Sequence, residues 1–257
     1  MDSLAQILER FNRKERNLLI RTVLDCGQNK PPQLSEGFCQ KVTNQLGLDT
    51  IPSDAWWGTD YHINWLAGAL TIFMNGEAEV GRKRYPNPHL PIEVSLQGED
   101  SSQGNKRQLV EGNQEDVDLV IATERDLILI EAKAYSTFGN PQIASKIDRL
   151  NLLHDFYEEL AASGSDRVVR FHLLLLSPKK PQNLERLWPN WAPKNKESEI
   201  PWIKLQTNAT PSILNVTRCD ENGLSMAAGT HWHVINYQSG ILGDVHSEIA
   251  QTEGGGG

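Results

Sequence analysis

Two short apolar runs separated by a polar turn constrain the fold of this chain more than any other feature. Residues 117–122 and 127–132 are rich in Val, Ile and Leu. Runs of this length and composition predict strands, and the short turn predicts an antiparallel hairpin. Three charged residues, Asp118, Glu131 and Lys133, interrupt or close the two runs. Because a buried strand gains no packing energy from charge, we expect these residues to serve chemistry.

The register expected for this hairpin brings the charges together. A two-residue turn at 124–125 folds the runs so that Asp118 lies opposite Glu131. Side chains opposite each other in this way share a face, with Cβ atoms about 5 Å apart. Since side chains alternate along a strand, Lys133 joins that face while Ala132 points away into the packing.

Two carboxylates at this separation repel each other unless a cation lies between them. Oxygen ligands suit Mg²⁺ or Mn²⁺, which keep water and substrate phosphate in their remaining positions. The neighbouring Lys133 supplies a compact positive charge for a phosphate oxygen or for a metal-bound nucleophilic water. The pattern therefore predicts a divalent-metal site for phosphodiester hydrolysis.

The hairpin resembles the PD-(D/E)XK phosphodiesterase superfamily, the restriction-endonuclease-like nucleases. That family has an Asp at the start of one strand and a Glu-x-Lys on the next, here Asp118 and Glu131-Ala132-Lys133, followed by a helix. The resemblance covers roughly residues 60–180. It implies that Asp118 and Glu131 bind the metal, that the Ala132 carbonyl completes the ligand set, and that Lys133 assists the attacking water.

Two further expectations come from the same resemblance. Gln142 matches the Gln that some branches place at the start of the following helix, near the phosphate, although Lys146 stands where those branches often have Tyr. Many members also carry an acidic residue on the helix before the sheet. Here that ligand stays open between Glu77, Glu79 and Asp116, the last of which shares the strand face of Asp118.

The pattern as a whole predicts an α/β fold, in which helices flank a mixed, restriction-endonuclease-like central sheet. We expect helices starting near Ser3, Ser35 and Pro141, another from Ser53 or Thr59 to Asn75, and strands at 91–96, 168–176 and 230–237. The expected organisation is a helical region at 1–58, a nuclease core at 59–180, an irregular Trp- and Pro-rich extension packed on the core at 181–250, and a disordered tail at 251–257.

The net charge of -8 argues against a global basic field for nucleic acid. DNA would therefore meet local basic segments at 82–84, 106–107 and 179–180, or be delivered by a protein partner. The longest apolar stretches fall short of the about 18 residues that a membrane span needs. Met1 is followed by an amphipathic pattern, so we expect no membrane association and a cytoplasmic location.

The cysteines and a pair of histidines provide weaker signals. Cys26, Cys39 and Cys219 lack Cys-x-x-Cys spacing, which favours buried small side chains over a disulfide framework or a zinc site. His231 and His233 would share one strand face, a spacing compatible with a metal pair, but no third ligand lies near them in the sequence.

The leading functional hypothesis is a metal-dependent nuclease, expected to be an endonuclease acting on DNA, alone or within a defence or repair system. Many such nucleases are homodimers that cut both strands, so a homodimer is an open alternative to a monomer. The alternative function is a non-catalytic subunit that keeps the nuclease fold as a binding or assembly module. The acidic net charge favours that alternative.

Overall fold

The computed structural model describes residues 2–24, 33–77, 80–90, 107–112, 115–134, 138, 141–163, 167–205 and 213–237. Contacts within the chain divide it into two compact units, Met1–Leu205 and Gln206–Gly257. The boundaries expected near residues 58 and 180 both lie inside the first unit. They stay predictions, as does the packing of 181–250 on the core.

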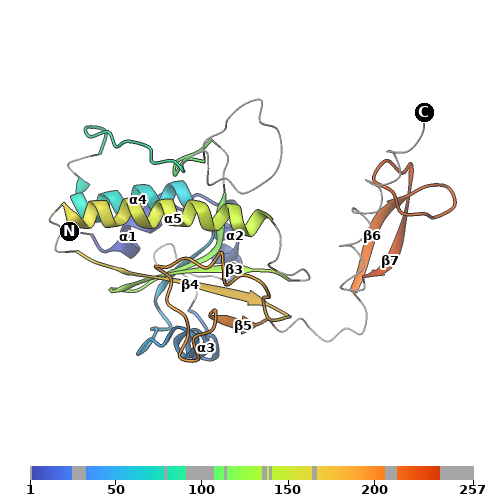
Figure 1. Cartoon of the computed structure of the whole chain (residues 1–257), viewed down its shortest axis with the longest axis horizontal. Helices are drawn as coiled ribbons and strands as arrows, with labels where there is room; N and C mark the ends of the chain where they lie inside the picture. Colours follow the sequence, from blue (N-terminus) through green and yellow to red (C-terminus); the bar gives the residue numbers. More distant parts are fainter. Residues whose placement is uncertain are drawn as a thin grey trace. The chain divides into compact units, whose positions relative to one another are not determined.

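The first unit is built on a mixed sheet that has five strands in its described part, in the order β1-β2-β3-β4-β5 (Figure 1). The strands are β1 (Trp56–His62), β2 (Asp116–Ala122), β3 (Asp126–Ala132), β4 (Arg170–Ser177) and β5 (Trp202–Lys204). The first three strands pair antiparallel, and β3, β4 and β5 pair parallel. The predicted α/β class is therefore confirmed.

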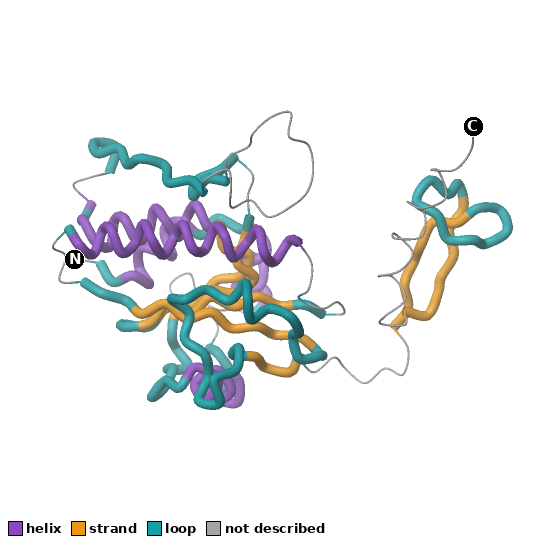
Figure 2. Tube along the Cα trace, in the orientation of Figure 1, coloured by secondary structure: helices purple, strands orange, loops and turns teal. Residues whose placement is uncertain are grey.

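Helices lie on both faces of this sheet (Figure 2). They are α1 (Leu4–Phe11), α2 (Glu15–Val23), α3 (Glu36–Leu46), α4 (Ile63–Asn75) and α5 (Pro141–Ala162). One face is covered by α4 and α5, which pack side by side, and α1 packs on α4; α3 packs against β4 and β5 from the other face. Each face has its own cluster of buried side chains, so the sheet is enclosed between two apolar cores.

Three predicted helix starts are confirmed by their local chemistry. Ser3 caps α1, and its hydroxyl accepts a hydrogen bond from the Gln6 amide as part of a capping box. The Ser35 hydroxyl caps α3 by accepting a hydrogen bond from the Phe38 amide, and Gly47 ends that helix with a left-handed backbone at φ 65°. Pro141 is the first residue of α5, where its missing amide hydrogen costs no hydrogen bond.

The helix expected from Ser53 or Thr59 is wrong in its first part. Residues 56–62 form β1, and the helix begins only at Ile63. β1 pairs with β2 from Trp56 opposite Ala122 to His62 opposite Asp116, so its backbone groups are satisfied by a strand far away in the sequence. Aromatic and β-branched residues also favour such a pleated surface. The helical spacing of apolar residues in this segment therefore comes from α4 alone.

The later strands agree better with expectation. β4 at Arg170–Ser177 confirms the strand predicted at 168–176, and α5 buries the expected face with Ile143, Ile147, Leu150, Phe156 and Leu160. The strand expected at 91–96 lies outside the described residues. The short strand β5 follows the Trp- and Pro-rich segment and was not predicted, because three residues carry too little pattern.

The second unit contains a two-stranded antiparallel sheet of β6 (Ile213–Cys219) and β7 (His231–Tyr237). β7 confirms the last predicted strand. His233 lies opposite Thr217 and contacts the Ser225 hydroxyl at 3.3 Å, while His231 lies opposite Cys219. Cys39 and Cys219 are buried free thiols, as predicted, and Cys26 falls outside the described residues.

None of the described helices combines the length and the apolar character that crossing a bilayer requires.

Candidate active site at the β2–β3 hairpin

The β2–β3 hairpin has the predicted register. Leu119 pairs with Ile130 and Ala122 pairs with Leu127. One step further in the same register, Asp118 lies opposite Glu131. The two strands are tied at this point by a hydrogen bond of 2.7 Å, in which the Ala132 amide donates to Asp118 Oδ2. The Asp118 carboxylate is therefore held beside the end of β3.

Glu131 is the most unusual carboxylate of the described chain. Its side chain is only 2% exposed, and its Oε2 accepts a hydrogen bond of 2.6 Å from Lys146 Nζ. The other oxygen, Oε1, is buried without a hydrogen-bond partner among the described residues. Burial, reinforced by the nearby Asp118 carboxylate, raises the pKa of Glu131 to about 8, although Lys146 and Lys133 oppose the shift.

This environment fits a divalent cation. Lys146 pairs with one oxygen of Glu131, but the second oxygen has no described partner and another carboxylate lies in the neighbouring strand, and both features are costly. Within the described ranges, no group of three or more His, Cys, Asp or Glu side chains is arranged to hold a metal. Mg²⁺ is often bound through only one or two carboxylates, with water and substrate oxygens completing its shell. Asp118, Glu131 and the Ala132 carbonyl are the residues that would hold it.

Lys133 is positioned by the parallel pairing of β3 and β4. It follows the last residue of β3, and its amide donates to the Leu176 carbonyl of β4 at 2.8 Å. Its half-buried side chain is close enough to lower the pKa of Glu131 through its charge. The lysine expected to act on phosphate or water thus stands at the same strand end as the two carboxylates.

The sequence marked Lys146 only as a departure from a family pattern, whereas the structure makes it the direct partner of Glu131. Helix α5 carries Lys146 three residues after Ile143 and four before Leu150, and both of these are buried. That spacing puts Lys146 on the sheet-facing side of the helix. The helical spacing of Lys146 from Ile143 and Leu150 is therefore the sequence signal that places Lys146 on the sheet-facing side of α5.

Buried Arg149, one turn after Lys146, anchors α5 to its surroundings. Its guanidinium donates to Asn64 Oδ1 at 2.8 Å, to the Leu109 carbonyl at 2.9 Å and to Glu115 Oε2 at 3.3 Å. Glu115 directly precedes β2, so this ion pair connects α5 to the β2–β3 hairpin. Arg149 therefore holds the turn of α5 that follows Lys146 against the segments around Asn64, Leu109 and Glu115.

Gln142 lies in the first turn of α5, but its side chain is outside the described part of the chain. Its predicted contact with phosphate stays a prediction. Glu79 also falls outside the described residues.

Glu77 is not brought to the hairpin. The Ile63 amide, at the start of α4, donates to the Glu115 carbonyl beside β2, whereas Glu77 follows the far end of this 13-residue helix. At 1.5 Å per residue the two ends are about 20 Å apart. Glu77 instead forms an exposed ion pair with Arg10.

Asp116 shares a strand with Asp118 but has other partners. Its Oδ1 contacts His62 Nδ1, and its Oδ2 accepts from Lys14 Nζ at 2.7 Å. His62 is itself buried and packs edge-on against Trp65. The Asp116 carboxylate is therefore part of a separate ion network between β2, β1 and the segment before α2.

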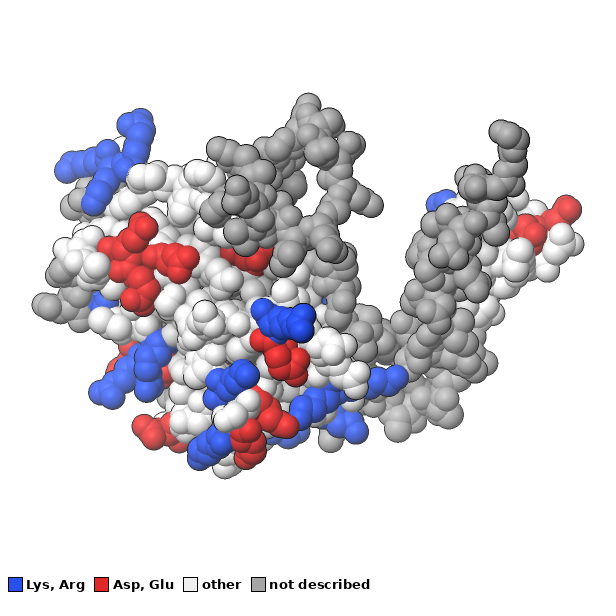
Figure 3. Space-filling model, in the orientation of Figure 1, with Lys and Arg blue, Asp and Glu red and all other residues white. Residues whose placement is uncertain are grey.

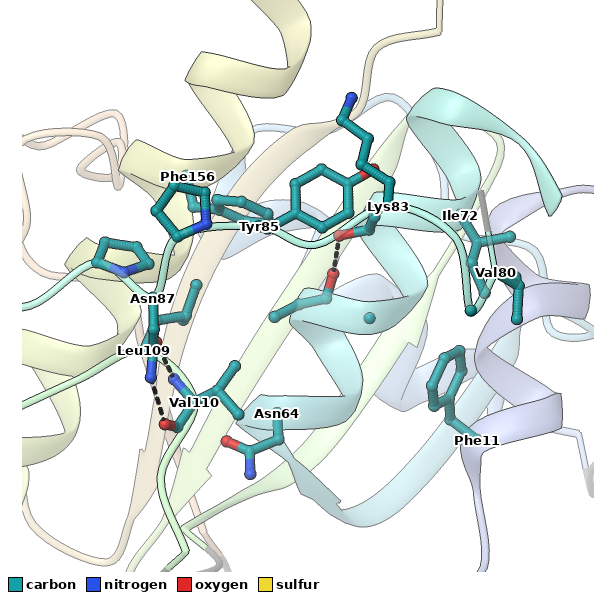
Figure 4. Close-up of a pocket in the computed structure, with 16 residues that line it drawn as sticks. Phe11, Asn64, Ile72, Val80, Lys83, Tyr85, Asn87, Leu109, Val110 and Phe156 are labelled. Atoms are coloured by element: carbon teal, nitrogen blue, oxygen red, sulfur yellow. Dashed lines mark hydrogen bonds between the residues drawn. The ribbon is translucent and has the colours of Figure 1, made fainter. Parts of the chain in front are cut away.

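A cavity of about 470 Å³ lies elsewhere, between α4 and the segment at 80–90 (Figure 4). Its lining is mostly apolar. The Asn87 side-chain amide donates to the Val110 carbonyl at 2.8 Å, and its Oδ1 accepts from the Val110 amide at 3.0 Å. None of the predicted site residues lines this cavity. It is thus distinct from the charged hairpin.

Comparison of the chain with protein-family models, with curated proteins and with solved structures finds no match. The chemical assignment of the hairpin therefore rests on its own residues.

Proposed function

We propose that this chain is a metal-dependent nuclease that hydrolyses phosphodiester bonds of DNA, with Asp118 and Glu131 as ligands for Mg²⁺ or Mn²⁺. The observation that carries the proposal is the buried Glu131 carboxylate, whose Oε1 lacks a partner in the described structure and whose neighbour across the hairpin is a second carboxylate. An unpaired buried oxygen costs about 1–3 kcal/mol. Such a cost is typical of functional sites.

The order of the elements supports a restriction-endonuclease-like core. An antiparallel hairpin carries Asp118 near the start of one strand and Glu131-Ala132-Lys133 at the end of the next. Helix α5 then crosses over to β4, which pairs parallel to β3. This is the sequence of elements that the PD-(D/E)XK resemblance implies from its hairpin onward. One difference is that α4 follows β1, where the resemblance implies a helix before the sheet.

Each charged residue of the site has its own role in the proposed hydrolysis. A bound divalent cation would supply Lewis acidity to a phosphate oxygen and acidify its bound water. Asp118 and Glu131 hold the charge that retains such an ion, and the hydrogen bond from the Ala132 amide fixes the Asp118 carboxylate. Lys133 places its ammonium beside the phosphate, where negative charge increases in the transition state. Lys146 orients Glu131 through Oε2.

A non-catalytic subunit with the same fold is the second candidate function. It is favoured by the net charge of -8 and by the lack of a third clustered ligand side chain in the described ranges. A scaffold of this kind does not need to bind Mn²⁺ at Asp118 and Glu131. Calorimetric titration of the protein with Mn²⁺ therefore separates the two functions.

The direct test is hydrolysis of plasmid and linear DNA by purified protein in the presence of Mg²⁺ or Mn²⁺. Asp118→Ala, Glu131→Ala and Lys133→Ala are each expected to abolish cleavage. Glu124→Ala is the matched control, because this exposed carboxylate lies in the turn at the opposite end of the same hairpin. Cleavage that survives all three site substitutions would remove the assignment.

A further inference from the structure

The parallel strands β3, β4 and β5 end at one edge of the sheet, and their registers align two lysines there. Ala132 pairs with Leu176, and the next residue, Lys133, donates its amide to the Leu176 carbonyl. On the other side of β4, Ser177 pairs with Lys204, the last residue of β5. Lys133 and Lys204 therefore flank the end of β4 in a single row.

The two lysines also share the face of the sheet that carries the candidate site. Leu175 pairs with Glu131 on one side and with Trp202 on the other. Residues opposite each other on neighbouring strands point to the same face. Lys133 comes two residues after Glu131, and Lys204 two residues after Trp202. Lys204 is therefore assigned to the α5 face, where Glu131 meets Lys146.

The charge of Lys204 is not neutralised within the described chain. Lys204 and Lys179, which follows the end of β4, are both exposed, and neither has a carboxylate within ion-pair distance among the described residues. The adjacent Lys180 differs, because it pairs with Glu199 at 2.7 Å. Figure 3 shows lysine and arginine side chains gathered where β4 and β5 end, with acidic side chains between them.

Ser177 lies between Lys133 and Lys204 in this row, and its side chain is hydrogen-bonded to neighbouring residues. The buried Ser177 hydroxyl donates to the Lys179 carbonyl at 2.7 Å and accepts from Trp202 Nε1 at 3.0 Å. Neighbouring strands lie about 4.8 Å apart, so the two lysine backbones are separated by about 10 Å. If the reacting phosphate lies beside Lys133, Lys204 is therefore displaced along the row toward a neighbouring phosphate of the same nucleic-acid strand.

From this row we infer that Lys204, with Lys179, binds a phosphate of the nucleic acid beyond the one that reacts, so that the substrate is a polynucleotide crossing the ends of β3, β4 and β5. The inference rests on the proposed function for the location of the reacting phosphate. Lys204 is a positioning residue, because it holds the substrate without touching the reacting atoms.

Two substrates of different length test this role. Lys204→Gln is expected to raise KM for an oligonucleotide severalfold with kcat nearly unchanged, because the lysine binds ground state and transition state alike. Hydrolysis of bis(p-nitrophenyl) phosphate, which is too short to reach β5, is expected to stay at the wild-type rate. Lys41→Gln is the matched control, since Lys41 is an exposed lysine on α3, across the sheet.

Binding measured without cleavage keeps this inference separable from the proposed function. In an Asp118→Ala background, fluorescence anisotropy with a labelled oligonucleotide gives the dependence of affinity on salt. Each lost phosphate contact lowers the slope of log K against log salt by about 0.7–0.9. Lys204→Gln is expected to lower it by that amount, and Lys41→Gln to leave it unchanged.

The outcomes are distinct. If the wild-type protein cleaves neither substrate, but Lys204→Gln weakens oligonucleotide binding and Lys41→Gln does not, the nuclease proposal fails and the role of Lys204 in binding nucleic acid stands. Equal oligonucleotide affinity and equal salt slope in the Lys204→Gln and parent proteins would overturn the proposed phosphate contact of Lys204. An equal loss of activity toward the short diester would also overturn it, because Lys204 would then act at the reacting centre.

Discussion

Lys146 Nζ of α5 lies 2.6 Å from Glu131 Oε2 of β3, although the two residues are 15 positions apart in the sequence. This pair joins the helix to the strand end that carries the candidate site. It satisfies one oxygen of a carboxylate whose second oxygen has no partner in the described structure. The charge balance of the hairpin therefore depends on a residue outside the hairpin.

The buried Glu131 predicts a fall in stability with rising pH. Its folded pKa of about 8 lies above the usual 4.5, so the folded state binds the proton more tightly than the unfolded state does. The stabilisation is fully present below the usual pKa and is lost as pH rises through about 8. Urea unfolding with chelator present should show the free energy of unfolding decreasing between pH 5 and 8, by at most about 1.4 kcal/mol per unit. Glu131→Gln should flatten this dependence, and a slope that survives in the variant would contradict the assignment to Glu131.

Removal of Lys146 is expected to strengthen the same pH dependence. Lys146→Met deletes the cation that lowers the pKa of Glu131, so the carboxyl group should stay protonated to higher pH. The variant should lose more stability at pH 9, where wild-type Glu131 is ionised and paired, than at pH 6. Urea unfolding at the two pH values measures the difference. An identical loss at both would mean that Lys146 acts only through its packing.

Asp118→Asn separates the structural role of Asp118 from its proposed role in binding metal. Asn keeps an oxygen that accepts from the Ala132 amide, while it removes the negative charge that adds to the effect of burial in raising the pKa of Glu131. Without metal, the melting temperature should equal or exceed that of the wild type. Saturating Mn²⁺ should stabilise the wild type, by about 2.7 kcal/mol at 100 times Kd, and leave the variant unchanged. Stabilisation of both proteins by Mn²⁺ would place the ion elsewhere.

Arg149→Leu is expected to be severely destabilising. The fully buried guanidinium is the anchor of α5, and its removal takes a donor from Glu115, Asn64 and the Leu109 carbonyl. Among the described residues, Glu115 keeps only the longer ion pair with Arg107, at 3.7 Å, and Asn64 Oδ1 keeps the Glu111 amide at 3.3 Å. Loss of one partner of a buried ion pair costs about 3–5 kcal/mol. Arg16→Ala is the matched control: Arg16 is exposed and its ion pair with Asp60 is worth less than about 1 kcal/mol. Urea unfolding of both variants measures the contrast, and equal effects would argue against the anchor.

Local patterns were sufficient for most elements of the described chain. Ser3, Ser35 and Pro141 mark helix starts because capping and proline geometry act within a few residues. β1 was misassigned because its strand character depends on pairing with β2, which follows more than 50 residues later. An aromatic segment next to a helix carries no local sign of that partner.

The sequence by itself determined the hairpin, its register and the shared face of Asp118, Glu131 and Lys133, because alternation and a two-residue turn are local rules. Only the tertiary structure decided that Glu131 is buried and paired with Lys146, that Asp116 belongs to a network with His62 and that Lys204 stands in the row of Lys133. Those relationships depend on where a crossover helix and the parallel strands come to rest. They are set by packing between segments distant in the sequence, and no local pattern encodes such contacts.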